Sequence, residues 1–271
     1  MANLTELSLA DLQLDCEAVR VLAEAVMHSP TLRGLQLEMN LIEWQGGTYL
    51  GEMLAVSKHL RRLDLSCNRL RAEGISELLC TAACANTSLT SLNLSRNFCV
   101  GIDHIHGFPK NLSIMNISTN NINVPGAVKL SKILDNEDCK LQILYVQHNL
   151  IGDDGVCVIC DALNRNIQLR LLDLSENMIT ITGVMYVVSM LSTNTTLQRL
   201  HLCRNEKINN DAWSLLETHH EQFWGLHYLD LTETAVTEKQ GEHWYRERKL
   251  LVHFDDKKDS ESEDSDTDED A

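Results

Sequence analysis

Hydrophobic residues along this chain recur in one frame, with aliphatic residues at positions one, four and six and asparagine at position nine. Residues 169–179 show it as L-x-x-L-x-L-x-x-N-x-I. Copies start at nine leucines: Leu4, Leu32, Leu60, Leu89, Leu112, Leu141, Leu169, Leu197 and Leu226. Successive copies lie 28, 28, 29, 23, 29, 28, 28 and 29 residues apart, and so regular a period indicates a solenoid of stacked repeats.

The middle of each frame predicts a short strand with one buried face. In Leu172-Asp173-Leu174, apolar residues alternate with a polar one, and successive side chains of a strand point to opposite faces. We therefore expect Leu169, Leu172 and Leu174 to face the core. Leu171 and Asp173 should face the other way.

The asparagine at position nine needs its own explanation. The chain turns just after the strand, and a buried amide can donate to and accept from the backbone groups that lose their strand partners. Seven asparagines are expected to form this structural ladder: Asn40, Asn68, Asn97, Asn120, Asn149, Asn177 and Asn205. The first and last frames carry Leu12 and Thr234 instead, as atypical terminal repeats often do.

The stretch between consecutive strands predicts a helix in most repeats. Residues 153–163 place apolar side chains at helical spacing behind Asp153 and Asp154, which favour a helix N-terminus. Five further stretches follow the same plan: Glu17–Met27, Glu73–Cys84, Gly126–Leu134, Thr182–Leu191 and Asp211–His219.

Over roughly residues 1–250, the frame and period resemble those of leucine-rich repeat proteins of the ribonuclease-inhibitor-like class. This resemblance implies an α/β leucine-rich repeat solenoid, a horseshoe with a parallel concave sheet and convex helices. We expect one solenoid of about nine repeats over residues 1–254, with a C-terminal cap from about residue 238. Residues 255–271 are expected to form a disordered acidic tail.

The 23-residue step predicts a loop in place of a helix. Residues 98–109 include two glycines and a proline, so we expect a short convex loop and a local change in curvature. His104 and His106 could form a metal pair, but no third ligand lies nearby in the sequence. Cys157 and Cys160 lack a partner pair, and their helical register favours burial. Neither metal nor cofactor is expected.

Apolar residues at outward strand positions single out repeats five to eight. Ile114, Ile143 and Leu171 occupy the same position of the frame in adjacent repeats. A side chain at this outward strand position is expected to face solvent. Apolar anchors beside Tyr and Arg are typical of protein-binding hot spots, although isolated exposed apolar residues are also ordinary. The predicted concave partner site comprises Ile114, Ile143, Tyr145, His148, Leu171, Arg199, His201, Arg204 and Tyr228.

Charge and cysteine content narrow the function classes. The net charge is −16, of which residues 255–271 contribute −8 through ten acidic residues and two lysines. An acidic chain disfavours binding to nucleic acid and to anionic membranes, and no apolar run reaches membrane-spanning length.

Nine cysteines without a signal peptide favour reduced thiols, hence a cytoplasmic or nuclear location. Sequons such as those at Asn86 and Asn194 would matter only in a secretory route.

Two C-terminal segments have competing interpretations. Residues 250–254 are expected to cover the last repeat, but Lys249 with Val252 and Phe254 also loosely resembles a phosphatase-docking motif with its basic residue too distant. The tail is either a solvating segment or a phosphorylated one. Its candidate sites have an acid three residues downstream, as casein kinase 2 substrates do: Ser260, Ser265 and Thr267.

The first frame begins only four residues into the chain. Its strand edge would be open, so we expect a monomer unless that edge pairs with another chain, or unless the chain is a truncated product.

No catalytic motif is visible, so we expect a non-catalytic protein-interaction scaffold with a protein partner. Three alternatives stay open. A GTPase activator resembling Ran activators would use an arginine of the early repeats, with Arg69 and Arg71 as candidates. The others are a ribonuclease-inhibitor-like inhibitor and a regulatory subunit of protein phosphatase 1.

Overall fold

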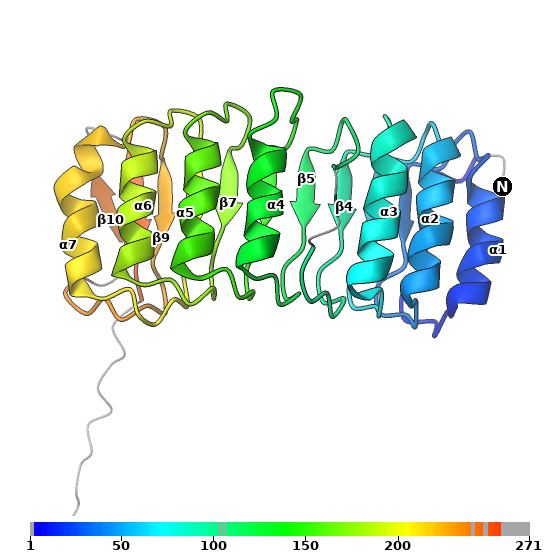
Figure 1. The fold of residues 1–271 in the computed structure, drawn as a ribbon, viewed down its shortest axis with the longest axis horizontal. Coiled ribbons are helices and arrows are strands. Elements are labelled where there is room, and N and C mark those ends of the chain that lie inside the picture. The colour runs from blue at the N-terminus through cyan, green and yellow to red at the C-terminus, as the bar shows by residue number, and fades with distance from the viewer. Residues whose placement is uncertain (1–2, 103–104, 106, 240–241, 246–248, 256–271) are drawn as a thin grey trace, which may run out of the picture.

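Each leucine frame forms a three-residue strand, and the strands stack in sequence order. The computed structural model describes residues 3–102, 105, 107–239, 242–245 and 249–255. The frames give β1 (Glu6–Ser8), β2 (Gly34–Gln36), β3 (Arg62–Asp64), β4 (Ser91–Asn93), β5 (Ile114–Asn116), β6 (Ile143–Tyr145), β7 (Leu171–Asp173), β8 (Arg199–His201) and β9 (Tyr228–Asp230). They pair in parallel, each with the next (Figure 1).

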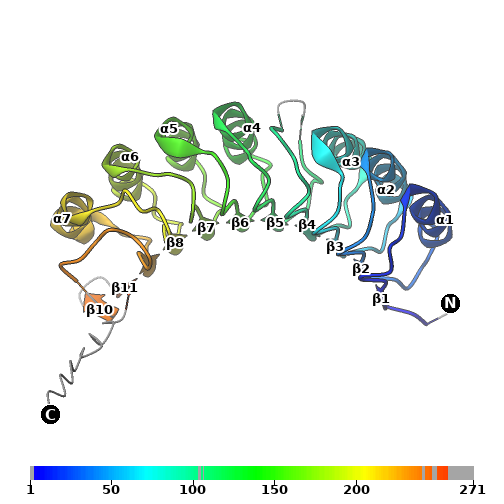
Figure 2. The ribbon, with the colours of Figure 1, turned by 90° about the horizontal axis from the view of Figure 1, so that it is seen from below.

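Helices cover the other side of the sheet. They are α1 (Cys16–Val26), α2 (Trp44–Val56), α3 (Arg71–Ala85), α4 (Val124–Leu134), α5 (Gly152–Leu163), α6 (Ile181–Leu191) and α7 (Asn210–His219), with a 3-10 turn η1 (His220–Gln222) after α7. Figure 2 shows the strands lining the concave side of an arc and the helices its convex side. The predicted horseshoe is therefore confirmed. No helix in the described residues is long and apolar enough to cross a membrane.

The core is a continuous row of leucines between sheet and helices. The middle residues of neighbouring strands, such as Leu144, Leu172 and Leu200, are paired in register and fully buried. Burial of each such side chain stabilises the fold by about 1.5–3 kcal/mol. Because each repeat covers its neighbour's leucine, the frame is stable only as a stack.

The helix α2 is absent from the predicted helices. Three glycines within its thirteen residues weaken the helical signal. The structure shows why a glycine stands at position 47: an added Cβ would lie 2.2 Å from the backbone oxygen of Gly74. The missing side chain lets α2 and α3 pack backbone to backbone.

Between β4 and β5 the described residues contain a loop and no helix, as predicted. The loop nevertheless contributes to the core, because Cys99, Ile102 and Ile105 are buried. It lies on the convex side between α3 and α4 (Figure 2). His104 and His106, the considered metal pair, lie outside the described residues.

The chain adds two further strands after the last frame. The strand β11 (Leu250–His253) pairs in parallel with β9, and β10 (Glu242–Tyr245) pairs antiparallel with β11. Phe254 is 1% exposed and packs edge-on against Trp213, with ring centroids 4.9 Å apart. Val252 is equally buried. The phosphatase-docking interpretation of Val252 and Phe254 is therefore wrong for this fold, since a docking motif must be accessible.

The position-nine asparagines bond to the backbone of two repeats at once. The Oδ1 of Asn149 accepts from the backbone N–H of Asn120 at 3.0 Å and of Ile122 at 2.8 Å. Its Nδ2 donates to the carbonyls of Val146 at 2.8 Å and Ile117 at 3.2 Å. Each asparagine thus fastens its own repeat to the preceding one.

A second asparagine set lies at the opposite edge and was not predicted. Asn86, Asn166 and Asn194 stand three residues before a frame leucine and are buried. Asn194 donates to the carbonyl of Leu163 at 2.6 Å and accepts from the backbone N–H of Leu197 at 2.8 Å. Two of these, Asn86 and Asn194, each begin an N-x-S/T sequon, and their side-chain amides are hydrogen-bonded inside the fold.

Candidate protein-binding surface

A row of apolar side chains crosses the concave face at the first residue of three strands. Ile114, Ile143 and Leu171 are register partners on β5, β6 and β7. The two isoleucines are half-buried. Leu171 is only 9% exposed, so the expectation that it meets solvent is wrong. Its register partners are Ile143 on β6 and Arg199 on β8, so its nearest strand neighbours come from other repeats and cannot be read from its own frame.

A polar row runs beside the apolar one at the third strand residue. Tyr145, Asp173 and His201 are register partners on β6, β7 and β8. Asp173 is 7% exposed, and its Oδ1 accepts the backbone N–H of Ser175 at 3.0 Å. That carboxylate shapes the chain after the strand, and Tyr145 is the half-buried ring beside it.

An aromatic and cationic cluster continues the concave face at β8 and β9. The guanidinium of Arg199 lies over the ring of Tyr228, 4.9 Å from its centroid. The ring of His201 also lies near that of Tyr228, with ring centroids 5.3 Å apart and the two planes tilted by 47°. Arginine–tyrosine stacking of this kind presents a rigid, amphipathic contact surface.

Asp230 anchors this cluster. Its Oδ2 lies 3.2 Å from the Nδ1 of His201, and its Oδ1 accepts from the backbone and hydroxyl of Thr232. Burial alone would raise the pKa of Asp230, but these hydrogen bonds outweigh burial and hold the pKa below its usual value. The carboxylate is therefore ionised and oriented at neutral pH.

Two of the predicted site residues, His148 and Arg204, lie on the rim rather than on the concave strands. They directly precede ladder asparagines, where the backbone is left-handed, with φ of 53° and 57°. The Nδ1 of His148 lies 2.9 Å from Glu176, and the Nε of Arg204 lies 3.0 Å from Glu233. Both pairs are exposed, so solvent screening leaves them little effect on stability.

Sequence reasoning missed this rim as a surface. Residues before and after each ladder asparagine form two parallel rows along the edge where the strands end. Between these rows lie two shallow grooves of about 350 and 320 Å³. The second is lined by His148, Leu150, Glu176, Met178, Arg204 and Lys207, among others. The signal that could have found them was the frame itself, because positions eight and ten share one edge in every repeat.

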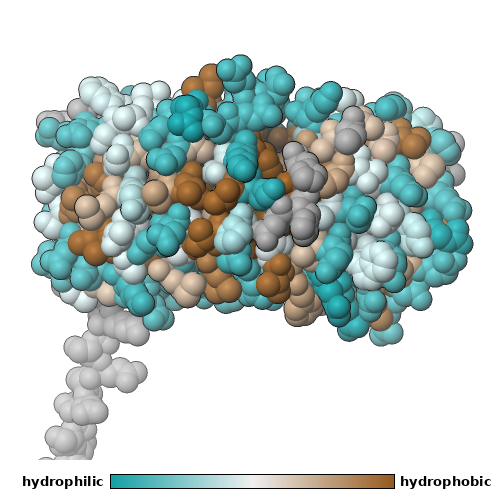
Figure 3. All heavy atoms as spheres, viewed as in Figure 1, coloured by the Kyte–Doolittle hydropathy of each residue, from teal (hydrophilic) through white to brown (hydrophobic). Residues whose placement is uncertain are grey.

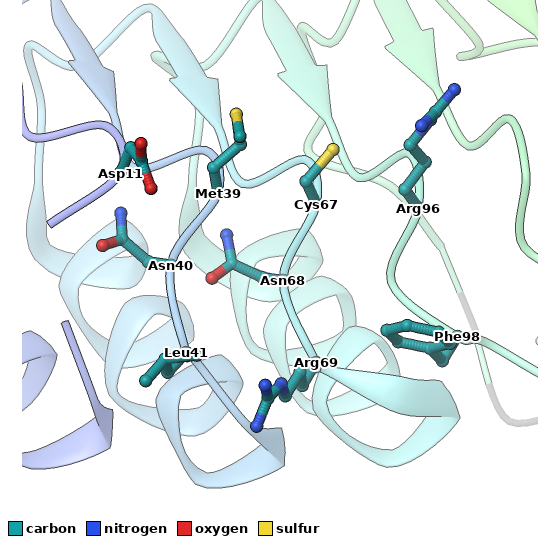
Figure 4. Close-up of a pocket in the computed structure, with 9 residues that line it drawn as sticks. All are labelled: Asp11, Met39, Asn40, Leu41, Cys67, Asn68, Arg69, Arg96 and Phe98. Carbon is teal, nitrogen blue, oxygen red and sulfur yellow. The ribbon is translucent and has the colours of Figure 1, made fainter. Parts of the chain in front are cut away.

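Figure 4 shows the first groove. Met39, Cys67 and Arg96 lie along one side, and Leu41, Arg69 and Phe98 lie along the other. Asn40 and Asn68 lie between the two sides. The GTPase-activator candidate Arg69 belongs to this groove, while Arg71 is exposed at the start of α3.

The convex face shows fewer features of a protein-binding surface than the concave face does. Figure 3 shows its apolar residues as separate spots among hydrophilic ones. One shallow depression between α6 and α7 includes the exposed Met185 and Ile181.

The cysteines and the tail add no site that the structure describes. Burial raises the pKa of the Cys160 thiol well above its usual value, as suits a packed, unreactive cysteine. Among the described residues, no three His, Cys, Asp or Glu side chains are grouped to hold a metal ion. The candidate phosphorylation sites Ser260, Ser265 and Thr267 lie outside the described residues.

Comparisons with known proteins agree with this architecture. Residues 56–79, 85–97 and 137–160 match the family described as Leucine Rich repeat. The ribonuclease inhibitor of Sus scrofa is 29% identical over 154 residues, which cover 53% of this chain and 33% of the inhibitor. NACHT, LRR and PYD domains-containing protein 4E of Mus musculus is 29% identical over 161 residues, or 59% of this chain and 14% of that protein.

A crystal structure of a TLR13–ssRNA13 complex has the same fold, with a TM-score of 0.58 at 20% identity, covering 94% of this chain and 32% of that one. The chain spans about a third of the length of the curated ribonuclease inhibitors it matches. Its repeated frame, parallel concave sheet and convex helices identify the chain as a leucine-rich repeat protein of the ribonuclease-inhibitor-like class.

Proposed function

We propose that the chain is a non-catalytic scaffold that binds a protein partner on the concave strands β5 to β9. Its leucine-rich repeat fold is one that serves protein interaction generally. The observation that carries the proposal is the continuity of the concave rows, from Ile114 and Ile143 to the stacked Arg199 and Tyr228. Rigid apolar and aromatic anchors beside an arginine are the usual composition of interface hot spots.

The side chains of the cluster at β8 and β9 hold one another in a fixed orientation, in addition to offering contact area to a partner. Asp230 holds His201 beside Tyr228, and the guanidinium of Arg199 lies over the Tyr228 ring. A partner therefore meets side chains that have already lost much of their rotamer freedom, which lowers the entropy lost on binding. The half-buried isoleucines add apolar area next to this oriented cluster.

Site-specific photo-crosslinking tests the proposal. A benzoylphenylalanine at position 143 or 228 should crosslink a discrete partner in cells, and one at the convex position Met185 should not. Tyr228→Ala combined with Arg199→Ala should reduce recovery of the same partner, with an unchanged melting temperature. Equal crosslinking from positions 185 and 228 would refute the concave site.

Two enzyme-related alternatives have direct assays. The likeness to ribonuclease inhibitors favours an inhibitor as the second candidate, and titration of pancreatic-type ribonuclease with the chain measures it. Stimulated GTP hydrolysis, lost on Arg69→Ala, would instead support the activator.

We further propose a cytoplasmic or nuclear location. The described cysteines are free thiols. The side-chain amides of Asn86 and Asn194 are buried and donate hydrogen bonds to backbone carbonyls, and attachment of a glycan would break these bonds. Fractionation of cells that express the tagged chain measures the location, and glycosidase-sensitive migration would contradict it. Phosphorylation of Ser260, Ser265 and Thr267 is likewise proposed, with mass spectrometry as its measurement.

A further inference from the structure

The rim groove of the early repeats combines exposed apolar side chains with arginines. We define the N-terminal rim groove by Met39, Leu41, Arg69, Arg96 and Phe98. Its apolar members are well exposed, with Phe98 at 67%, Met39 at 56% and Leu41 at 36%. Exposed apolar side chains that line one groove from adjacent repeats form a contiguous surface rather than scattered residues.

The arginines of this region have no partner among the residues that the structure describes. In the described part of the chain, Arg69, Arg96 and the nearby Arg71 have no carboxylate or carbonyl bonded to the guanidinium. The other described arginines do have contacts: Arg20, Arg62, Arg165 and Arg204 pair with carboxylates, Arg33, Arg61 and Arg170 donate to carbonyls, and Arg199 stacks on Tyr228.

Repeat eight provides the internal comparison. Arg204 holds the same frame position as Arg96, but Glu233 in the next repeat occupies its guanidinium at 3.0 Å. The residue of the repeat after Arg96 at that position is Thr119, which offers no charge. Asp11 lies at the far end of the N-terminal rim groove, and Glu43 touches Arg69 only through a backbone bridge. The early groove therefore keeps unpaired cations although the chain as a whole is strongly acidic.

We propose that the N-terminal rim groove is a second interaction surface, which binds an acidic peptide segment of a partner protein that also carries an aliphatic or aromatic side chain. Carboxylates of the peptide pair with Arg69 and Arg96, whose planar guanidinium groups suit bidentate pairing. The apolar side chain of the peptide packs against Phe98 and Leu41, which lie on either side of Arg69 along the groove. This surface is separate from the concave rows, so its binding does not depend on the proposed function.

The apolar side chains decide between this occupant and the chain's own tail. Residues 256–271 could match the arginines in charge, but they contain no apolar side chain larger than alanine. They would leave Phe98, Met39 and Leu41 in water, whereas a peptide of mixed character covers them.

Selection from a display library of random twelve-residue peptides on the immobilised full chain tests this proposal. Enriched peptides should combine Asp or Glu with an aliphatic or aromatic residue. Arg69→Glu combined with Arg96→Glu should weaken their Kd about tenfold or more, measured by fluorescence anisotropy, and added salt should weaken wild-type binding. Phe98→Ser should also weaken it.

Two controls keep the outcomes distinct. Arg204→Glu reverses the equivalent charge in repeat eight and should leave the Kd unchanged, as should the concave variant Tyr228→Ala. Circular dichroism melting reports whether each variant is folded. The proposal is overturned by enrichment without an acidic and apolar consensus, by equal affinity of the folded double variant, or by equally tight binding of a synthetic 256–271 peptide.

Discussion

Glu6 and Arg62 form an ion pair that spans the intervening strand β2 directly above Gly34. A Cβ added at Gly34 would lie 1.8 Å from the Glu6 carboxylate. The pair connects the first strand to the third and exists because the residue between them has no side chain.

Gly34→Ala is expected to displace the Glu6 carboxylate with little loss of stability. The obstructing atom is the end of a flexible, exposed side chain, and an exposed ion pair contributes at most about 1 kcal/mol. Gly47→Ala should destabilise the fold by about 1–3 kcal/mol, because the obstruction there is the Gly74 backbone. Urea denaturation of both variants measures the contrast, and equal losses would refute this reading of the two glycines.

Asn149→Ala should lower the free energy of unfolding by about 3 kcal/mol or more, since it leaves several buried backbone groups without partners. Chemical denaturation measures the loss. The exposed Asn164, whose amide oxygen accepts from the hydroxyl of Thr193, provides the control: Asn164→Ala should change stability by less than about 1 kcal/mol. A normal melting curve for Asn149→Ala would contradict the ladder's structural role.

Phe254→Ala should destabilise the chain by about 3–5 kcal/mol, because it leaves a cavity beside Trp213 in the C-terminal core. Guanidinium unfolding measures the difference. Trp224→Ala, at an exposed aromatic, should have a much smaller effect. If Phe254→Ala instead left stability intact, the segment would have to be accessible, contrary to its burial.

The Asp230 carboxylate should make stability dependent on pH in the acidic range. Its pKa is depressed in the folded state, so its contribution is fully present above the unfolded value of about 3.9 and is lost as pH falls through the folded pKa. Wild type should exceed Asp230→Asn in stability at neutral pH, with the difference shrinking below about pH 4. Denaturation of both proteins from pH 7 to pH 3 measures it, and a constant difference would argue against the depressed pKa.

The sequence was sufficient for the strands because each frame carries its own period-two pattern, as Leu172 and Leu174 show. It was insufficient where structure depends on neighbouring repeats. Leu171 is buried in a register between Ile143 and Arg199 of the adjacent strands. The helix α2 contains a glycine, Gly47, that is explained only by its contact with α3. His148 and Arg204 were assigned to the concave face because the left-handed turn that places them on the rim has no glycine to mark it.

That turn recurs in every repeat, with φ between 52° and 59° at the residue before position nine. Nine residues occupy it: Asp11, Met39, Cys67, Arg96, Thr119, His148, Glu176, Arg204 and Glu233. Side chains of such different chemistry share one backbone shape because the adjacent turn is held by main-chain bonds and not by their own preferences. The residues at this edge of the horseshoe can therefore be substituted one at a time without altering the backbone conformation of the repeats.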